Sequence, residues 1–165
     1  MITGARVVIT GLSRAVSSEI FRIVNQETFR ELTGTMYPVS EFEHEEWIKR
    51  VATSPDIKLF AVFDKETDQF LGTIGLKNFD QKNRNAELFI SLDSTGGYGA
   101  DAGETLVRFS FAHLNLHKIY LKVFATNQRA IRCYEKAGFQ SEGVLKQHHF
   151  ENGEYIDVIV MGRHR

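Results

Sequence analysis

A glycine-rich segment at residues 94–99 (Ser-Thr-Gly-Gly-Tyr-Gly) is the part of the sequence that most directly suggests ligand chemistry. It follows a strand-like apolar run at 87–92 and precedes a stretch from about Ala100 to Leu114 whose apolar spacing predicts a helix. Glycines let main-chain N–H groups approach an anion closely, and the start of a helix offers free donors and partial positive charge. The segment therefore suggests a diphosphate ligand, although many glycine loops between a strand and a helix are only turns.

Two common phosphate-binding patterns do not fit this segment. A loop of the GxxxxGK(S/T) type needs a lysine and a hydroxyl residue after its last glycine, whereas Gly99 is followed by Ala100 and Asp101. Residues 97–102 match the relaxed GxGxxA pattern, but they open no early βαβ unit, and no acidic residue ends the next predicted strand at Phe124. A P-loop triphosphatase and a Rossmann dehydrogenase are therefore both disfavoured.

Longer stretches around the glycine segment carry a resemblance to a known family. In order and spacing, residues 94–100, 115–121 and 125–139 resemble the acetyl-CoA-binding half of the GNAT N-acetyltransferases. The similarity continues through Glu142-Gly143 and Asn152-Gly153, and residues 33–47 and 72–76 resemble the branch with ribosomal-protein N-terminal and spermidine acetyltransferases. The resemblance covers nearly the whole chain.

This resemblance implies one N-acetyltransferase domain over residues 1–165. It implies a mixed α/β (α+β) fold, with about seven strands in a mostly antiparallel, splayed sheet and about four helices. Acetyl-CoA would be the cofactor and coenzyme A a product, with the acetyl group passing directly to a primary amine in a ternary complex. Protein N-termini, polyamines and amino sugars are the acceptor classes. The alternative is a non-catalytic module that binds acyl-CoA as a sensor.

The resemblance also assigns residues to the cofactor. Main-chain groups of the strand before the glycine segment would pair with the pantetheine amides, and the segment itself would hold the pyrophosphate. The implied cofactor-binding residues are Phe89, Ile90, Ser91, Leu92, Ser94, Thr95, Gly96, Gly97, Tyr98, Gly99, Ala100, Asn127, Arg129 and Lys136. Ser94 departs from the family, which usually has Gln or Arg there, so cofactor affinity is in question. Asn127 also suits a helix cap, and Arg129 and Lys136 also suit solvated helix positions.

Two side chains have implied catalytic roles. The resemblance places Tyr134 near the cofactor sulfur as the general acid that protonates the departing thiolate. The ordinary alternative is a half-buried helix tyrosine facing the core. Glu87 occupies a position where related enzymes commonly carry a glutamate proposed as general base, and its ordinary alternative is an exposed strand carboxylate.

Neither the lone cysteine nor the histidine pair predicts further chemistry. Cys133 has no base placed beside it by the sequence and has the character of a small buried apolar residue. His148 and His149 are adjacent in a predicted strand, so their side chains should point to opposite faces and not share an ion. We therefore expect no metal site.

The acceptor site is less determined by the sequence. Four glutamates crowd the second predicted helix, at positions 41, 43, 45 and 46. They could attract a cationic amine, or they could form a solvated face. Tyr37, Phe42 and Trp47 could line an acceptor groove or fill the core.

The elements that must position these residues follow from hydrophobic periodicity and turn signals. Strands are predicted at 6–12, 58–63, 70–76, 85–92, 119–124, 144–150 and 155–161, the last two joined at Asn152-Gly153. Helices are predicted at 17–29, from the capping-box sequence at Ser40 through Ile48, at about 100–114, and from Asn127 to Ala137.

Composition and charge narrow the remaining possibilities. The chain has 165 residues, 42% hydrophobic and 25% charged, which suits one ordinary globular domain. The formal net charge of -1 predicts neither nucleic acid nor an anionic membrane as a partner. No signal peptide or membrane span is indicated, and one cysteine fits a reducing compartment, so we expect a cytoplasmic protein. A homodimer is suggested only by the habit of the family.

Overall fold

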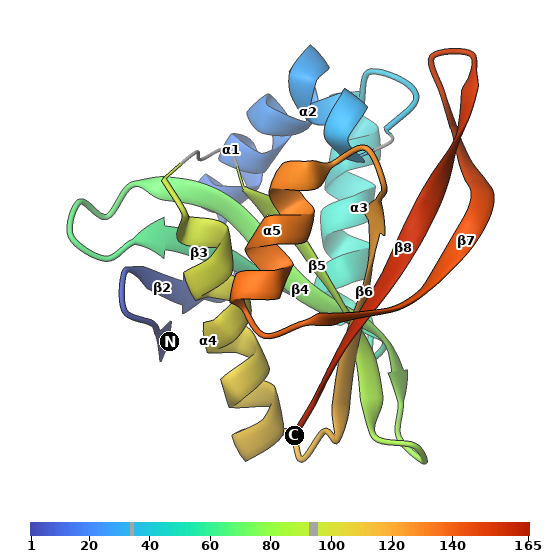
Figure 1. The fold of residues 1–165 in the computed structure, drawn as a ribbon. Coiled ribbons are helices and arrows are strands. Elements are labelled where there is room, and N and C mark those ends of the chain that lie inside the picture. The colour runs from blue at the N-terminus through green and yellow to red at the C-terminus, as the bar shows by residue number, and fades with distance from the viewer. Residues whose placement is uncertain (34, 93–95) are drawn as a thin grey trace.

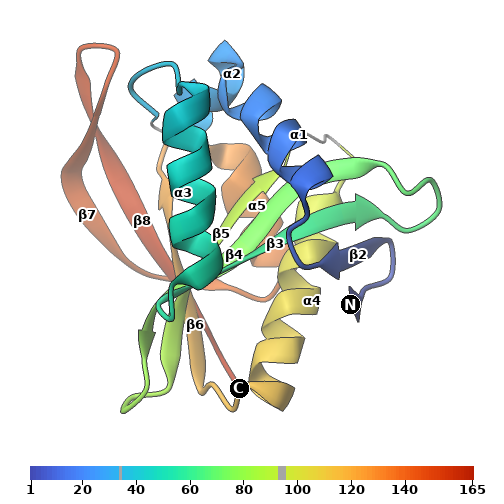
Figure 2. The same cartoon turned by 180° about the vertical axis from the view of Figure 1, so that it is seen from behind.

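The computed structural model describes residues 1–33, 35–92 and 96–165, which form an eight-stranded sheet with helices on both faces (Figures 1 and 2). The strands of this described part are β1 (Ile2–Thr3), β2 (Val7–Thr10), β3 (Ile57–Asp64), β4 (Phe70–Asp80), β5 (Asn85–Leu92), β6 (Lys118–Phe124), β7 (Gln140–Glu151) and β8 (Glu154–His164). Its helices are α1 (Arg14–Val24), α2 (Glu27–Thr33), α3 (Glu41–Thr53), α4 (Tyr98–His113) and α5 (Gln128–Lys136). No helix of this part is long and apolar enough to cross a bilayer.

The sheet has one parallel contact, and the two strands that make it diverge. Across the described residues the strand order is β1-β2-β3-β4-β5-β6-β8-β7, and each neighbouring pair is antiparallel except β5 with β6. The β5–β6 pairs run from Asn85 opposite Lys118 to Glu87 opposite Tyr120, while both strands continue further. Figure 1 shows them separating along residues 88–92 of β5 and 121–124 of β6, which we call the divergent segment. Within the described chain, β5 has a strand neighbour there only on its β4 side.

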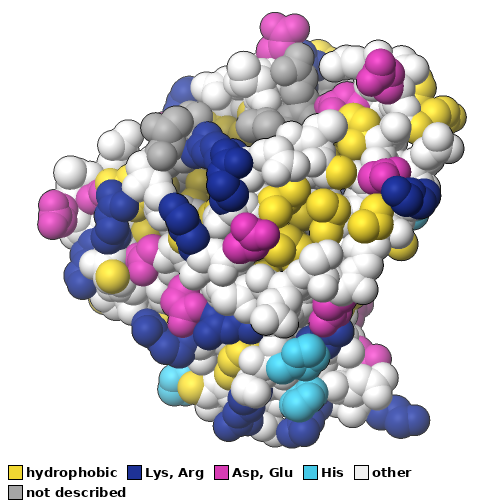
Figure 3. All heavy atoms as spheres, viewed as in Figure 1, with side chains coloured by type: hydrophobic (Ala, Val, Ile, Leu, Met, Phe, Trp, Pro, Cys, Tyr) yellow, Lys and Arg dark blue, Asp and Glu magenta, His cyan; other side chains and the backbone are white. Residues whose placement is uncertain are grey.

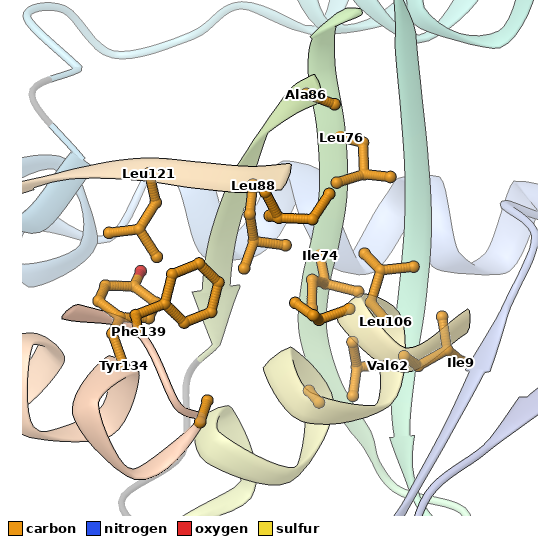
Figure 4. Packing of buried hydrophobic residues seen from close by; sticks show 14 of the residues in the cluster. Ile9, Val62, Ile74, Leu76, Ala86, Leu88, Leu106, Leu121, Tyr134 and Phe139 are labelled. Carbon is orange, nitrogen blue, oxygen red and sulfur yellow. The ribbon is translucent and has the colours of Figure 1, made fainter. Parts of the chain in front are cut away.

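Side chains alternate between the two faces of β5 and so define two layers. Ala86 and Leu88 belong to the large core under α4 and α5, together with Leu106, Leu121 and other apolar residues (Figure 4). The opposite face is covered by α1 and α3, which Figure 2 shows in front of the sheet. There, a smaller core contains Val16, Ile20 and Ala61. The two faces of β5 therefore belong to different environments.

The start of α4 is fixed by a glycine and a carboxylate. Gly97, the residue before the helix, has φ 79°, a left-handed conformation that glycine adopts without strain. In the first turn, Asp101 accepts hydrogen bonds from the main-chain N–H groups of Ala5, Arg6 and Val7 at 2.8–3.1 Å. Asp101 thereby joins the beginning of the chain to the helix start that follows the glycine segment.

The fold class is confirmed, with one strand and one helix more than expected in the described part of the chain and with several element boundaries shifted. In the described residues there are eight strands and five helices instead of about seven and four, because β1 is an additional short strand and the predicted helix 17–29 is two helices. The first of these helices ends where the Asn25 side chain bonds the main chain of Val39 and Phe21. Its N-cap is Ser13, and α4 begins at Tyr98 instead of near Ala100.

Other local predictions are confirmed. The Ser40–Glu43 capping box at the start of α3 has both of its hydrogen bonds. The β7–β8 hairpin turns at Asn152 and Gly153, which have φ 49° and 84°. Positive φ at both central residues is the geometry that an Asn-Gly hairpin turn requires.

Candidate active site

The glycine segment brings α4 and α5 together. Ser94 and Thr95, two of the predicted cofactor residues, lie outside the described residues. Gly96 and Gly97 are exposed, and Tyr98, Gly99 and Ala100 form the first turn of α4. A Cβ added at Gly99 would lie 3.0 Å from the Cys133 sulfur, so this glycine permits close packing of the two helices.

The helix α5 has a capped start and carries two positive charges near Cys133. The Asn127 side chain accepts a hydrogen bond from Ala130 N at 3.0 Å, which confirms the capping role. Burial raises the pKa of the Cys133 thiol, and the charges of Arg129 and Lys136 partly oppose that shift. Both cations therefore lie near the cysteine that contacts the start of α4. Figure 3 shows Lys and Arg side chains over the region where α4 begins and α5 runs beside it, a suitable environment for a phosphate.

Tyr134 combines a core position with a polar atom that is free to donate. Its ring is buried and meets Phe139 edge-on, with ring centres 6.1 Å apart. Figure 4 shows its oxygen directed toward Leu121 of β6, one of the strands of the divergent segment. Within the described residues the hydroxyl has no hydrogen-bond partner, and burial raises the pKa of Tyr134. A phenol that keeps its proton at neutral pH can serve as a general acid.

Glu87 is a buried carboxylate with one hydrogen-bond donor and one ion-pair partner. Only 5% of it is exposed, which excludes an exposed strand carboxylate. Asn78 Nδ2 donates to Oε2 at 2.8 Å, and Lys77 Nζ lies 3.5 Å from Oε1. Asn78 reaches the carboxylate from an irregular part of β4, where its φ is 54°. Burial, followed by the negative charge of Glu87, raises the pKa of the neighbouring Tyr120.

The candidate acid and base approach the divergent segment from opposite faces of the sheet. Tyr134 belongs to the core under α4 and α5. Glu87 alternates with Ala86 and Leu88 of that core, so its side chain points to the α1 and α3 face. A reacting group held between β5 and β6 would thus have a proton donor on one side and a carboxylate on the other.

A cavity of about 530 Å³ lies on the Glu87 face of the sheet. It is lined by residues of α1 and α3, the segment 35–39, and strands β3, β4 and β5. Phe89 and Ser91 of the divergent segment form part of its wall. The cavity volume is in the range of small-molecule sites, which are typically about 300–1,000 Å³.

Some of the acceptor residues suggested by the sequence line this cavity, and others lie outside it. Tyr37 and Trp47 line it, whereas Phe42 is 80% exposed and lies elsewhere. Glu43 is the member of the acidic run that lines the wall. The other three, Glu41, Glu45 and Glu46, are exposed, and Glu46 forms an ion pair with Lys49 at 2.7 Å.

Comparison with known proteins assigns this architecture to a family. Residues 6–140 match the family model described as an acetyltransferase (GNAT) domain. The chain belongs to the GNAT family. Its fold is also similar to that of a known protein, seen in a crystal structure of spermidine N-acetyltransferase from Vibrio cholerae in complex with CoA and spermine. That structure aligns with a TM-score of 0.88 and 28% identity, covering 97% of this chain and 96% of that one.

Sequence relatives carry several different names. The L-amino acid N-acetyltransferase AaaT of Escherichia coli is 32% identical over 121 residues, which is 71% of this chain and 74% of the relative. The uncharacterized N-acetyltransferase p20 of Bacillus licheniformis is 34% identical over 102 residues, 60% of this chain. This match spans 57% of the length of p20. The GNAT assignment confirms the family resemblance drawn from the sequence motifs.

Several contacts around the GNAT glycine segment could not be read from the sequence. Arg6 Nη1 donates to the main-chain oxygen of Gly96 at 2.6 Å, and the guanidinium lies 4.2 Å from the centre of the Tyr98 ring. The Tyr98 hydroxyl donates to Asp64 Oδ2. These partners are tens of residues apart in the chain, so no local pattern predicts that they meet. Among the residues of this region, only Asp101 has a local signal, because an acidic residue is favoured in the first turn of a helix.

The remaining candidates of the sequence analysis take no part in this arrangement. The raised pKa of Cys133 keeps the thiol protonated, which disfavours an acyl-accepting role. His149 stacks on Phe124 with ring centres 4.0 Å apart, and His148 is exposed. No group of three or more His, Cys, Asp or Glu side chains in the described chain is arranged to hold a metal ion.

Proposed function

We propose that this GNAT protein transfers the acetyl group of acetyl-CoA directly to a primary amine in a ternary complex. The amine attacks the thioester carbonyl and loses a proton, the carbon–sulfur bond breaks, and the thiolate receives a proton. The products are the N-acetylated amine and coenzyme A. Tyr134 is the proton donor to the thiolate, and Glu87 accepts the amine proton, directly or through water.

The observation that carries this proposal is the placement of Tyr134 and Glu87 on opposite faces of the sheet, next to the divergent segment. The attacking amine and the leaving sulfur are separate substituents of the tetrahedral carbon, so the proton acceptor and the proton donor must stand at different positions around it. The hydroxyl of Tyr134 has no partner in the described chain, whereas Glu87 is fixed by Asn78 and Lys77. A fixed base and an available acid suit direct transfer.

The residues present also fit acetyl-CoA. On the β6 side of β5, the main chain of residues 89–92 has no strand partner in the described part, so its groups can pair with the pantetheine amides. Gly97 and the first turn of α4 offer main-chain donors to the pyrophosphate, with Arg129 and Lys136 nearby. When bound, acetyl-CoA supplies the activated acyl group. Because that cofactor is made and used inside the cell and the chain has one cysteine, we propose a cytoplasmic site of action.

Two measurements test the proposal. Thiol release from acetyl-CoA should depend on an added amine, and intact-mass spectrometry of enzyme mixed with acetyl-CoA alone should show no acetylated protein. Thiol release without an acceptor, together with acetylated Cys133, would replace direct transfer by a covalent mechanism. Calorimetric binding of acetyl-CoA with no turnover on any amine would favour the sensor module.

A further inference from the structure

The lining of the cavity differs from what a polycationic acceptor needs. Five Phe, Tyr or Trp rings contribute to it, and aliphatic side chains form about half of the remaining wall. Among the described lining residues, the uncharged polar side chains are those of Thr35, His44, Thr73 and Ser91. The rings are those of Phe29, Tyr37, Trp47, Phe70 and Phe89. Such a wall stabilises an apolar body by removing its surface from water. A linear polyamine would instead place several ammonium groups against it, each of which needs a polar partner when it is desolvated.

Negative charge in this wall is limited. Among the described lining residues, Glu43 is the single carboxylate. Its Oε2 already accepts the Ser40 N–H at 2.8 Å, the bond that lowers the pKa of Glu43 most and completes the capping box of α3. One carboxylate engaged in a helix cap can complement at most one ammonium group.

A positive charge is also present on the wall. Arg50, in the last turn of α3, lines the cavity. Its side chain makes no hydrogen bond or ion pair within residues 1–33, 35–92 and 96–165. A guanidinium with free donors is well suited to bind a carboxylate in two parallel hydrogen bonds, and it repels a polycation.

We infer that the acceptor is the α-amine of a free amino acid with a large apolar side chain, most favourably an aromatic one. The carboxylate of this amino acid pairs with Arg50, and its side chain lies among the aromatic rings. This inference rests on the proposed function, because it names the amine that the transfer uses. It distinguishes this cavity from an acceptor site for spermidine, although a structural relative carries that name.

The test compares three amines at saturating acetyl-CoA, with thiol release by the full chain as the readout. L-phenylalanine should show a kcat/KM about 100-fold higher than spermidine, since it gains ring burial and the Arg50 contact. 2-Phenylethylamine keeps the ring but lacks the carboxylate, and should fall about tenfold or more below L-phenylalanine.

Arg50→Met separates the carboxylate contact from the fit of the ring. In this variant the ratio of kcat/KM for L-phenylalanine to kcat/KM for 2-phenylethylamine should fall to about one. Lys49→Met is the matched control, because Lys49 is exposed and pairs with Glu46. It should leave the preference unchanged.

The failures are distinguishable. L-phenylalanine turned over no faster than spermidine, or a preference that persists in Arg50→Met, overturns the inference while amine-dependent transfer still stands. Absence of turnover with every amine, in protein that binds acetyl-CoA, overturns the proposed function and the inference with it.

Discussion

The two faces of the sheet are built in different ways. On the α4 and α5 face, the proposed cofactor site consists mainly of main-chain groups: one helix start, a glycine with positive φ, and the edge of β5. On the α1 and α3 face, the cavity is a collection of side chains from separate helices, strands and a connecting segment. A main-chain site tolerates changes of residue type, whereas a side-chain site changes its ligand with each substitution. Under the proposed function, the first face would hold the cofactor that GNAT proteins share, and the second would select the acceptor.

Removing the candidate acid should have the largest effect. Tyr134→Phe keeps the ring against Phe139 but loses the proton donor, so kcat should fall about 100- to 1,000-fold. The affinity for acetyl-CoA, measured by calorimetry, should change less than twofold. Tyr155→Phe, on the exposed hairpin strand β8, is the control and should behave as wild type. An unchanged kcat in Tyr134→Phe would remove this residue from the chemistry.

A change at the candidate base tests the opposite face. Glu87→Gln keeps an acceptor for Asn78 Nδ2, yet it cannot take a proton, and kcat should fall about tenfold to 100-fold. The wild-type rate should decline as the pH is lowered, because a general base must be unprotonated. That acidic decline should be weakened in the variant. A pH–rate profile with the same shape and height in both proteins would assign Glu87 a purely structural role beside Lys77.

Helix packing on the cofactor face can be tested without chemistry. Gly99→Val places a branched side chain against the Cys133 sulfur and should lower the free energy of unfolding by about 2 kcal/mol in urea. Adding Cys133→Ala should recover part of the loss, because it removes the atom 3.0 Å away. At Gly143 a new Cβ would meet nothing within 4 Å, so Gly143→Val should be nearly neutral. Equal losses in the two single variants would show that helix contact is not the cause.

The smallest effect should come from the hydrogen bond between Tyr98 and Asp64. The Tyr98 hydroxyl, followed by main-chain donors, lowers the pKa of Asp64 to about 2. A lowered folded-state pKa stabilises the protein above the ordinary value of 3.8, and that contribution is lost as the pH falls toward 2. Tyr98→Phe should therefore be less stable than wild type at pH 6, with a difference that shrinks between about pH 4 and pH 2. A difference independent of pH over this range would contradict this explanation.

Local sequence signals predicted much of the fold and less of the site. The capping box at Ser40, the cap at Asn127 and the Asn152-Gly153 turn each depend on a few neighbouring residues, and all three are present. The break between α1 and α2 was missed because Asn25 bonds Val39, a contact across a loop that periodicity does not contain.

The candidate site follows the same rule. The family resemblance predicts a role for Glu87, whereas its hydrogen bond from Asn78 and its ion pair with Lys77 come from the irregular β4 segment. The position of Arg6 beside Gly96, and the set of side chains that line the cavity, result from contacts between elements far apart in the chain.

Divergence of β5 from β6 has a consequence for ligand selection. Main-chain groups along that edge must be hydrated while no ligand is bound, so a pantetheine arm exchanges water hydrogen bonds for amide ones and gains only about 1 kcal/mol for each. A thioester carrier without peptide-like amides would strip the same water and leave donors unsatisfied, at a cost of about 1–3 kcal/mol each. The divergence of the two strands would therefore contribute little to the affinity for coenzyme A and more to selectivity against carriers that lack amide groups.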